Sequence, residues 1–144
     1  MLPITTGEAR LVDDPQLRFT ASGVAVSNFR LVFQNRKRND DGTWSDDEDN
    51  ILWINASCWR QMAENVAESL RKGDLVLVTG KIKSRSYETS DGDKRTVIEL
   101  MVDEIGPTLR FRSVLHSDGA GGKVTRSSTP DAADPWAVPS EPPF

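Results

Sequence analysis

Residues 52–79 read Leu52-Trp-Ile-Asn-Ala-Ser-Cys-Trp-Arg-Gln-Met-Ala-Glu-Asn-Val-Ala-Glu-Ser-Leu-Arg-Lys-Gly-Asp-Leu-Val-Leu-Val-Thr79. The first eight residues alternate between small or aliphatic residues and Trp, Asn or Ser, which is typical of a strand with one wet face. Apolar residues then recur every four positions from Met62 to Leu70, so residues 60–73 predict one short amphipathic helix. The continuous apolar run at 75–79 predicts a strand buried on both faces.

The flanking segments extend this order into a barrel. Alternation predicts a strand over residues 23–33, and the acidic segment 39–50 predicts a long hairpin loop after it. Two further strands, 81–88 and 95–102, flank a turn, and residues 109–112 predict a short last strand. About five strands with one short helix after the third is the order of an all-β, five-stranded Greek-key barrel, the OB-fold. An SH3-like barrel is the alternative, although it less often has a full helix between strands three and four.

Composition divides the chain into a folded domain, 1–112, and a tail, 113–144. The tail contains 5 of the 8 prolines and a Gly-rich run, so it buries too little apolar area to offset its ordering entropy and is expected to be disordered. No pattern of a signal peptide and no apolar stretch of ~20 residues is present, which predicts a soluble, cytoplasmic protein without a membrane partner.

The net charge of −4 is unevenly distributed. The tail holds 2 basic and 4 acidic residues, and segment 39–50 holds 6 acidic and none basic. The remaining 100 residues therefore carry 16 basic against 12 acidic residues, a balance of +4. Because the local field governs binding, the overall acidity does not exclude a nucleic-acid ligand.

Catalytic and metal-binding constellations are missing from the sequence. The single histidine, His116, lies in the tail, and the single cysteine, Cys58, has no neighbours at metal-ligand spacing. No Gly-rich phosphate-binding loop is present. The sequence thus predicts a protein that is not an enzyme and that uses no metal or cofactor. Cys58 lies on the apolar side of its strand, which predicts a buried, inert thiol; a disulfide between two copies is the alternative.

Aromatic and basic side chains alternate along two of the predicted strands. Trp53 and Trp59 share the parity of the wet face, about 20 Å apart at ~3.3 Å per residue. Lys81, Lys83 and Arg85 share one parity with Tyr87. Rings for unstacked bases and cations for phosphates are what a single-stranded nucleic acid needs. The alternatives are core tryptophans and a solvated, charged edge strand.

The chain resembles the bacterial single-stranded-DNA-binding protein family, and within it the actinobacterial type. The segments that carry the resemblance include residues 14–23, 63–73, 78–81, 85–89, 94–97 and 102–107, and together they span about residues 11–112. Residues 5–10, Thr5-Thr-Gly-Glu-Ala-Arg10, form the first expected strand and are polar where the family has an apolar strand used in subunit pairing. This polar strand and the short tail suggest a specialised, short-tailed paralogue. The resemblance implies an OB-fold, a homotetramer and binding of single-stranded DNA with little sequence preference, in DNA replication, recombination or repair, near the nucleoid.

The resemblance also implies roles for particular residues. The expected stacking residues are Trp53, Trp59, Tyr87 and, at the start of the first binding hairpin, Phe33. The phosphate-binding residues that it implies are Arg18, Arg36, Lys37, Lys72, Lys83, Arg85 and Arg95. Lys81, which shares the parity of Lys83 and Arg85, and Arg60 complete the expected set. The chain ends in Glu141, Pro142, Pro143 and Phe144, which resemble the family's tip for docking replication and repair proteins. Only one acid lies in the last ten residues, so weaker docking is expected. An RNA-binding OB domain and an adaptor that works through its tail remain the rival interpretations.

Overall fold

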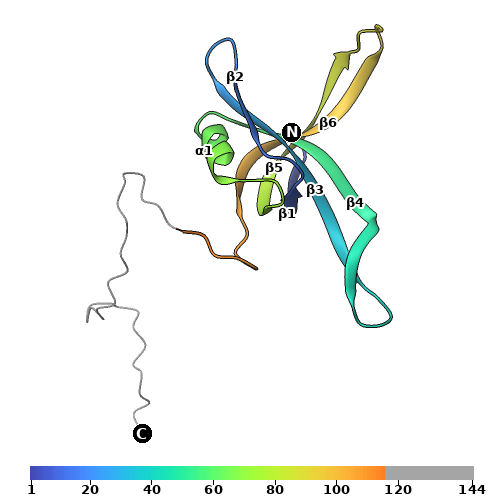
Figure 1. Ribbon diagram of the computed structural model, residues 1–144. Helices are drawn as coiled ribbons and strands as arrows, with labels where there is room; N and C mark the ends of the chain where they lie inside the picture. The colour runs from blue at the N-terminus through green and yellow to red at the C-terminus, as the bar shows by residue number, and fades with distance from the viewer. Residues whose placement is uncertain (116–144) are drawn as a thin grey trace, which may run out of the picture. The chain divides into compact units, whose positions relative to one another are not determined.

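A closed ring of β-strands forms the centre of the computed structural model, which describes residues 1–115. The elements are β1 (Ile4–Leu11), β2 (Gln16–Phe19), β3 (Ala25–Arg38), β4 (Trp44–Trp59), α1 (Gln61–Ser69), β5 (Leu75–Glu88) and β6 (Lys94–Pro107). The strand order is β1-β5-β6-β4-β3-β2, and an additional β1–β3 pairing closes the ring (Figure 1). Nearly all of the predicted tail, and the whole of its tip, lies outside the described residues.

The predicted fold class is confirmed. Five strands, β1, β3, β4, β5 and β6, make the barrel, and α1 follows the third of them in chain order. All pairings are antiparallel except β4–β6, which is parallel and short. The sequence did not predict β2, which pairs only with β3 and lies outside the ring as an added arm.

The barrel interior is small and apolar. Its largest fully buried aliphatic side chains come from four barrel strands and are Leu11, Leu31, Val76, Val78 and Leu100. Helix α1 packs Ala63 and Val66 against the same core. On β4 the side chains of Ile54, Ala56 and Cys58 are buried, as the alternation predicted, but Leu52 is half exposed. This inward parity fixes the outward direction of the residues between them.

The prediction of a long acidic loop at residues 39–50 was wrong. The turn spans only residues 39–43, and β3 and β4 continue on both sides of it as a hairpin arm that projects from the barrel (Figure 1). Gly42 has a φ of +86°, which a tight turn requires and glycine adopts freely. Acidic residues are tolerated in these strands because both faces of the arm meet solvent.

Residues 75–88 form one continuous strand, β5, rather than two. The sequence predicted burial of both faces at 75–79, but only Val76 and Val78 are buried, whereas Leu77 is 57% exposed. The strand changes register against β6 between Thr79 and Gly80, where a bulge bends it. The second arm, the β5–β6 hairpin, starts beyond this bend.

Two predicted element ends also differ. Helix α1 stops at Ser69, where the capping residue Leu70 is already extended, so the helix is shorter than the predicted 60–73. The predicted strand at 109–112 does not form, because β6 ends at Pro107 and the chain leaves the sheet after one further hydrogen bond, Thr108 N to Leu75 O.

The thiol of Cys58 is completely buried and faces the carbonyl oxygen of Ser27 at 4.0 Å. Burial raises the pKa of this thiol from 9.0 to about 11, so it stays protonated and unreactive at neutral pH. We expect a thiol reagent at pH 8 to label Cys58 no faster than the protein unfolds, whereas denatured protein is labelled at once. Because the folded-state pKa is the higher one, the stability that this thiol contributes is present below pH 9 and is lost as the pH rises towards 11. Rapid labelling of folded protein would contradict this and would favour a thiol available to a second copy.

Candidate nucleic-acid interface

The outward-pointing residues of β2, β3, β4, β6 and β5 form one continuous surface. Residues paired across neighbouring strands point to the same side of a sheet, so the register defines rows. One row runs Arg30, Asn55, Glu99, Lys83 from β3 to β5. The parallel β4–β6 pairing thereby connects β4, which carries the tryptophans, through β6 to β5, which carries the row of cations.

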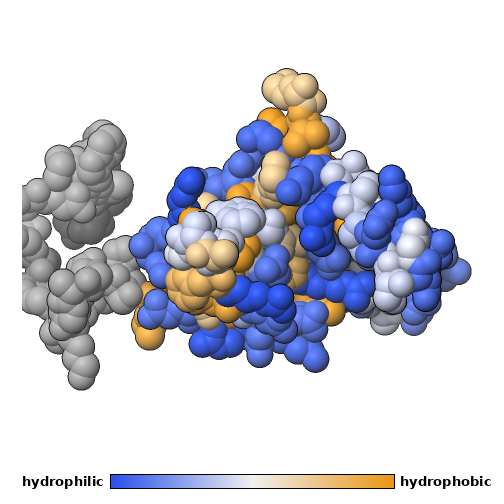
Figure 2. All heavy atoms as spheres, turned by 90° about the horizontal axis from the view of Figure 1, so that it is seen from above, coloured by the Kyte–Doolittle hydropathy of each residue, from blue (hydrophilic) through white to orange (hydrophobic). Residues whose placement is uncertain are grey.

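Two further rows extend this surface towards β2. One contains Arg18, Val26 and Trp59. The other crosses all five strands and contains Gln16, Asn28, Ser57, Met101 and Lys81. We call the surface made by these three rows, together with Trp53 and Arg85, the outer face. Figure 2 shows a face of the molecule on which hydrophilic residues predominate and apolar ones form separate small patches.

Trp53 and Trp59 of β4 are half exposed, at 48% and 45%. Each side chain is therefore accessible to a ligand while part of it stays covered by the protein. The prediction that they lie on the wetter face of their strand is confirmed, and the alternative of core tryptophans is wrong.

Arg30 is a member of the outer face that the sequence analysis missed. Its guanidinium carbon lies 5.3 Å from the centre of the Trp53 ring, within cation–π range. The contact restricts the ring and places a positive charge beside it. The parity of β3 would have found Arg30, because Phe29 and Leu31 on either side of it are buried.

The cations on β5 differ in their partners. Lys81 pairs with Asp103 at 3.5 Å and Arg85 with Glu99 at 2.8 Å. Within the described part of the chain, Lys83 forms no ion pair. The Lys81–Asp103 pair is exposed and contributes little, so Lys81 remains able to turn towards an anionic ligand. The Glu99 side chain is only 15% exposed, so Arg85 stays on it and offers a phosphate its remaining N–H donors.

Tyr87 and Arg95 lie directly opposite each other on the β5–β6 hairpin. The Tyr87 ring is 43% exposed. The structure thus brings together a ring and a cation that are eight positions apart in the sequence. Both lie on the part of the hairpin that extends beyond the edge of the barrel.

Phe33 differs from the other predicted stacking residues. Its ring packs on the barrel core, and an added Cβ at Gly7 would lie 3.2 Å from it. The ring is therefore partly covered by β1, which leaves little of it for a base.

Arg36 and Lys37 lie on the β3–β4 arm, in a different electrostatic setting. Residues 35–50 carry 3 basic and 6 acidic residues, and Arg36 itself approaches Asp46 at 3.9 Å. Hydrogen bonds from the Thr43 side chain and backbone lower the pKa of Asp41, so this acid stays charged. The arm is a net-negative surface, which disfavours a phosphate there.

The remaining predicted cations lie around the margin of the outer face. Arg18 on β2 donates to the Gln16 side chain at 3.1 Å. The backbone N–H of Lys72 donates to Asp14 at 2.8 Å, which fixes the α1–β5 turn beside β2. The third of these cations, Arg60, lies between Trp59, the last residue of β4, and the first residue of α1.

Arg60 has an unusual backbone conformation, with φ 61° and ψ −134°. It is the only non-glycine residue with positive φ among residues 1–115. Its N–H donates to Ala25 O at 2.8 Å, so the turn after Trp59 is held in place. Strain of this kind costs roughly 1–3 kcal/mol and is commonly found at functional positions.

We expect Arg60→Gly to raise the free energy of unfolding by about 1 kcal/mol, because glycine adopts positive φ without strain. Arg60→Ala is the matched control, since it removes the same side chain and keeps the strained backbone. Urea denaturation measures both. Equal stabilities of the two variants would show that the strain is not relieved by glycine.

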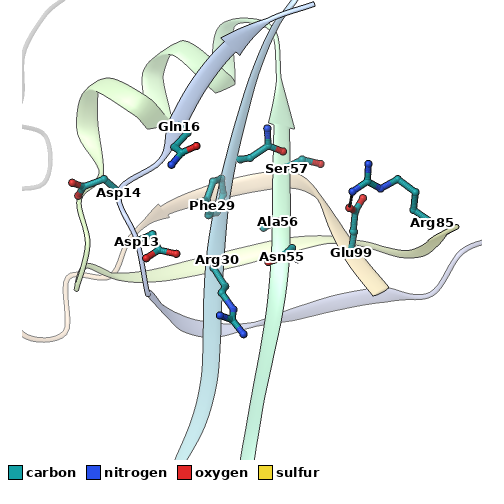
Figure 3. Close-up of a pocket in the computed structure, with 11 residues that line it drawn as sticks. Asp13, Asp14, Gln16, Phe29, Arg30, Asn55, Ala56, Ser57, Arg85 and Glu99 are labelled. Carbon is teal, nitrogen blue, oxygen red and sulfur yellow. Dashed lines mark ion pairs between the residues drawn. The ribbon is translucent and has the colours of Figure 1, made fainter. Parts of the chain in front are cut away.

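A polar hollow of about 330 Å³ lies in the middle of the outer face (Figure 3). It lies beside Asn55 and Ser57 of β4, which stand between Trp53 and Trp59 along that strand. Asp13 and Gln16 line it from the β2 side, and the Arg85–Glu99 ion pair lines it from the β5–β6 side. Phe29 and Ala56, whose side chains are buried in the barrel core, also line it.

Within residues 1–115, no three His, Cys, Asp or Glu side chains gather as metal ligands. The helical part of this region falls short of the length and apolarity needed to cross a bilayer.

A five-stranded barrel with exposed rings and cations on one face defines an OB-fold binding domain. Residues 7–108 match the family described as Single-strand binding protein family. The chain belongs to this family, as the resemblance in its sequence predicted.

Actinobacterial relatives are similar over most of the chain. A single-stranded DNA-binding protein of Paenarthrobacter nicotinovorans is 47% identical, over 90% of this chain and 83% of that protein. One from Mycobacterium tuberculosis is 44% identical, over 88% and 82% respectively. The crystal structure of the small single-stranded DNA-binding protein from Streptomyces coelicolor covers 75% of this chain and 95% of that chain, with 27% identity and a TM-score of 0.63.

Proposed function

We propose that this chain binds single-stranded DNA on the outer face, with little overall sequence preference. The register across the β4–β6 pairing carries the proposal, because it joins rings and cations from separate strands into one surface. The names of the relatives support the same ligand. The role is binding and protection of the strand, without catalysis.

Base stacking on Trp53 and Trp59 provides the sequence-tolerant part of the affinity. Every base has a π-face, and one stack on an aromatic side chain is worth roughly 1–3 kcal/mol. The two rings, about 20 Å apart along β4, would hold separate bases of one strand. Tyr87 extends the path onto the β5–β6 hairpin, whereas Phe33 is the weakest of the proposed stacking residues because its ring packs on the core.

Phosphate contacts provide the salt-dependent part. Lys83 lies at the β5 end of the row that starts at Arg30 and has no carboxylate partner in an ion pair within residues 1–115, so it is the cation most available to a phosphate. The other proposed phosphate contacts are Arg18, Arg60, Lys72, Lys81, Arg85 and Arg95, with Arg30 added from its contact to Trp53. Arg36 and Lys37 stay predictions, disfavoured by the acidic arm on which they lie.

Salt dependence tests the proposal. For a single strand, log K falls with log salt by about 0.7 for each phosphate that is neutralised. We expect Lys83→Gln to lower the slope for oligo-dT by about that amount and to weaken binding. Arg38→Gln, which removes an exposed cation from the acidic arm, should leave the slope unchanged. Equal effects of both variants would mean that only the overall charge matters.

Assembly and partners belong to the same proposal. Exposed Ile4 on β1 and Leu77 on β5 lie on neighbouring, paired strands and support burial against further copies, with a homotetramer as the expected assembly. Mass measurement at several salt concentrations, with and without oligo-dT, tests this.

The docking tip lies in the last residues of the chain. We propose that Glu141, Pro142, Pro143 and Phe144 recruit replication and repair proteins, in the cytoplasm at the nucleoid. Deleting residues 136–144 should leave DNA affinity nearly intact, and loss of the principal activity would favour an adaptor instead. Competition between matched RNA and DNA oligomers separates this proposal from an RNA-binding role.

A further inference from the structure

We infer that the polar hollow in the outer face is a base-reading subsite that prefers bases carrying an exocyclic amino group. The inference rests on the proposed function and adds to it a local preference within generally tolerant binding. Its basis is the arrangement of carboxylates and amides around one hollow, rather than the exposed rings on either side of it.

The position of the hollow fits a base between two stacked ones. It lies around Ala56, three residues from Trp53 and three from Trp59, or about 10 Å along the strand from each. A strand that stacks on both rings must pass over it. The volume of about 330 Å³ lies at the lower end of the range of small-ligand pockets, roughly 300–1,000 Å³.

Five charged side chains line the hollow, the carboxylates of Asp13, Asp14 and Glu99 and the guanidinium groups of Arg30 and Arg85, which gives a net charge of −1. Arg85 pairs with Glu99, Arg30 lies over the Trp53 ring, and Asp14 accepts from the Lys72 N–H. The hollow therefore disfavours a phosphate and favours a hydrogen-bond donor.

Asp13 precedes β2 and Glu99 lies on β6, with β3 and β4 between them, so carboxylates face the hollow from both sides (Figure 3). A carboxylate only accepts hydrogen bonds. Arg85 holds Glu99 in place at 2.8 Å, so one carboxylate is oriented before any ligand arrives.

The ligand that matches is the Watson–Crick edge of an amino-bearing base. Cytosine, adenine and guanine have exocyclic amino groups, and carboxylates accept from the cytosine amino group in known base readout. Thymine has no amino group on this edge: its single N3–H lies between two carbonyl oxygens, which two carboxylates repel. The amides of Asn28 and Asn55 both donate and accept, and thus serve the remaining positions of the edge.

The test compares oligo-dC with an oligomer of the same length in which 2-pyrimidinone replaces cytosine and removes only the amino group. At slightly alkaline pH, we expect wild type to bind oligo-dC about five-fold more tightly, near the lower end of discrimination by a base-edge contact. In the double variant Asp13→Asn/Glu99→Gln the two oligomers should bind equally. The double variant Glu68→Gln/Glu104→Gln, which removes two exposed acids outside the hollow, is the charge-matched control and should keep the difference.

The outcomes are distinct. If wild type does not distinguish the two oligomers, or if the double variant still does, the hollow does not read the base. If neither oligomer binds to wild type, the proposed function itself fails.

Discussion

Replacing both outer-face tryptophans, in Trp53→Ala/Trp59→Ala, is expected to weaken binding to oligo-dT between about 30-fold and about 10,000-fold. Two stacks at roughly 1–3 kcal/mol each give roughly 2–6 kcal/mol. The fold should survive, because both rings are about half exposed and the core-facing residues of β4 are unchanged. Titration of the protein with oligo-dT at fixed salt measures the loss.

Trp44 provides the control for this experiment. It is 57% exposed on the acidic β3–β4 arm, away from the three rows of the outer face. Trp44→Ala therefore removes the same side chain without a stacking partner, and affinity should stay within two-fold, roughly the size of a neutral surface change. Quenching of tryptophan fluorescence on binding should persist in this variant and vanish in the double variant. Equal losses in the two proteins would refute the stacking positions.

Gly80→Ala is expected to destabilise the barrel by about 3 kcal/mol. An added Cβ would overlap the carbonyl oxygen of Met101 and lie 3.0 Å from the Val102 Cα. Both are backbone atoms of β6, so no side-chain rotation relieves the clash, and the cost falls at the upper end of that for overpacking. The bulge at this position would have to open, which also moves Lys81 and the strand beyond it.

Gly106 gives a matched control for this prediction. It also lies in a barrel strand, yet an added Cβ there meets nothing within 4 Å. Gly106→Ala should be neutral or stabilising by up to about 1 kcal/mol, because alanine loses less backbone entropy on folding. Chemical denaturation of both variants decides the matter: similar midpoints would show that β6 moves aside without cost.

Local patterns in the sequence predicted part of this surface and not the rest. Alternation over residues 52–59 was enough to place Trp53 and Trp59 on the wet side of β4. The adjacency of Lys83 to that side depends on the pairing of residue 55 with residue 99, and no local pattern encodes a register across that distance.

Other errors arose from rules that assume a packed sheet. Residues 44–50 are rich in Asp and Glu, which are depleted from strands, but an arm solvated on both sides removes that objection. Leu77 belongs to the apolar run that predicted a strand buried on both faces. Within this chain, however, its side chain is exposed to solvent. Arg30 was missed because it belongs to no run of basic residues. Only the parity of β3 identifies it as an outward-facing cation.

The β4–β6 pairing has a consequence for the order of folding. It joins only three residue pairs, from Asn55↔Glu99 to Ser57↔Met101, between segments 44 residues apart in the chain. The β3–β4 and β5–β6 hairpins are local and close short loops, so they form early, whereas this long-range closure comes late. Before closure Trp53 and Trp59 are on the β3–β4 hairpin, whereas Lys81, Lys83, Arg85 and Arg95 are on the β5–β6 hairpin. A nascent or partly folded chain therefore has no complete binding surface, and nucleic-acid affinity appears only with the last step of folding.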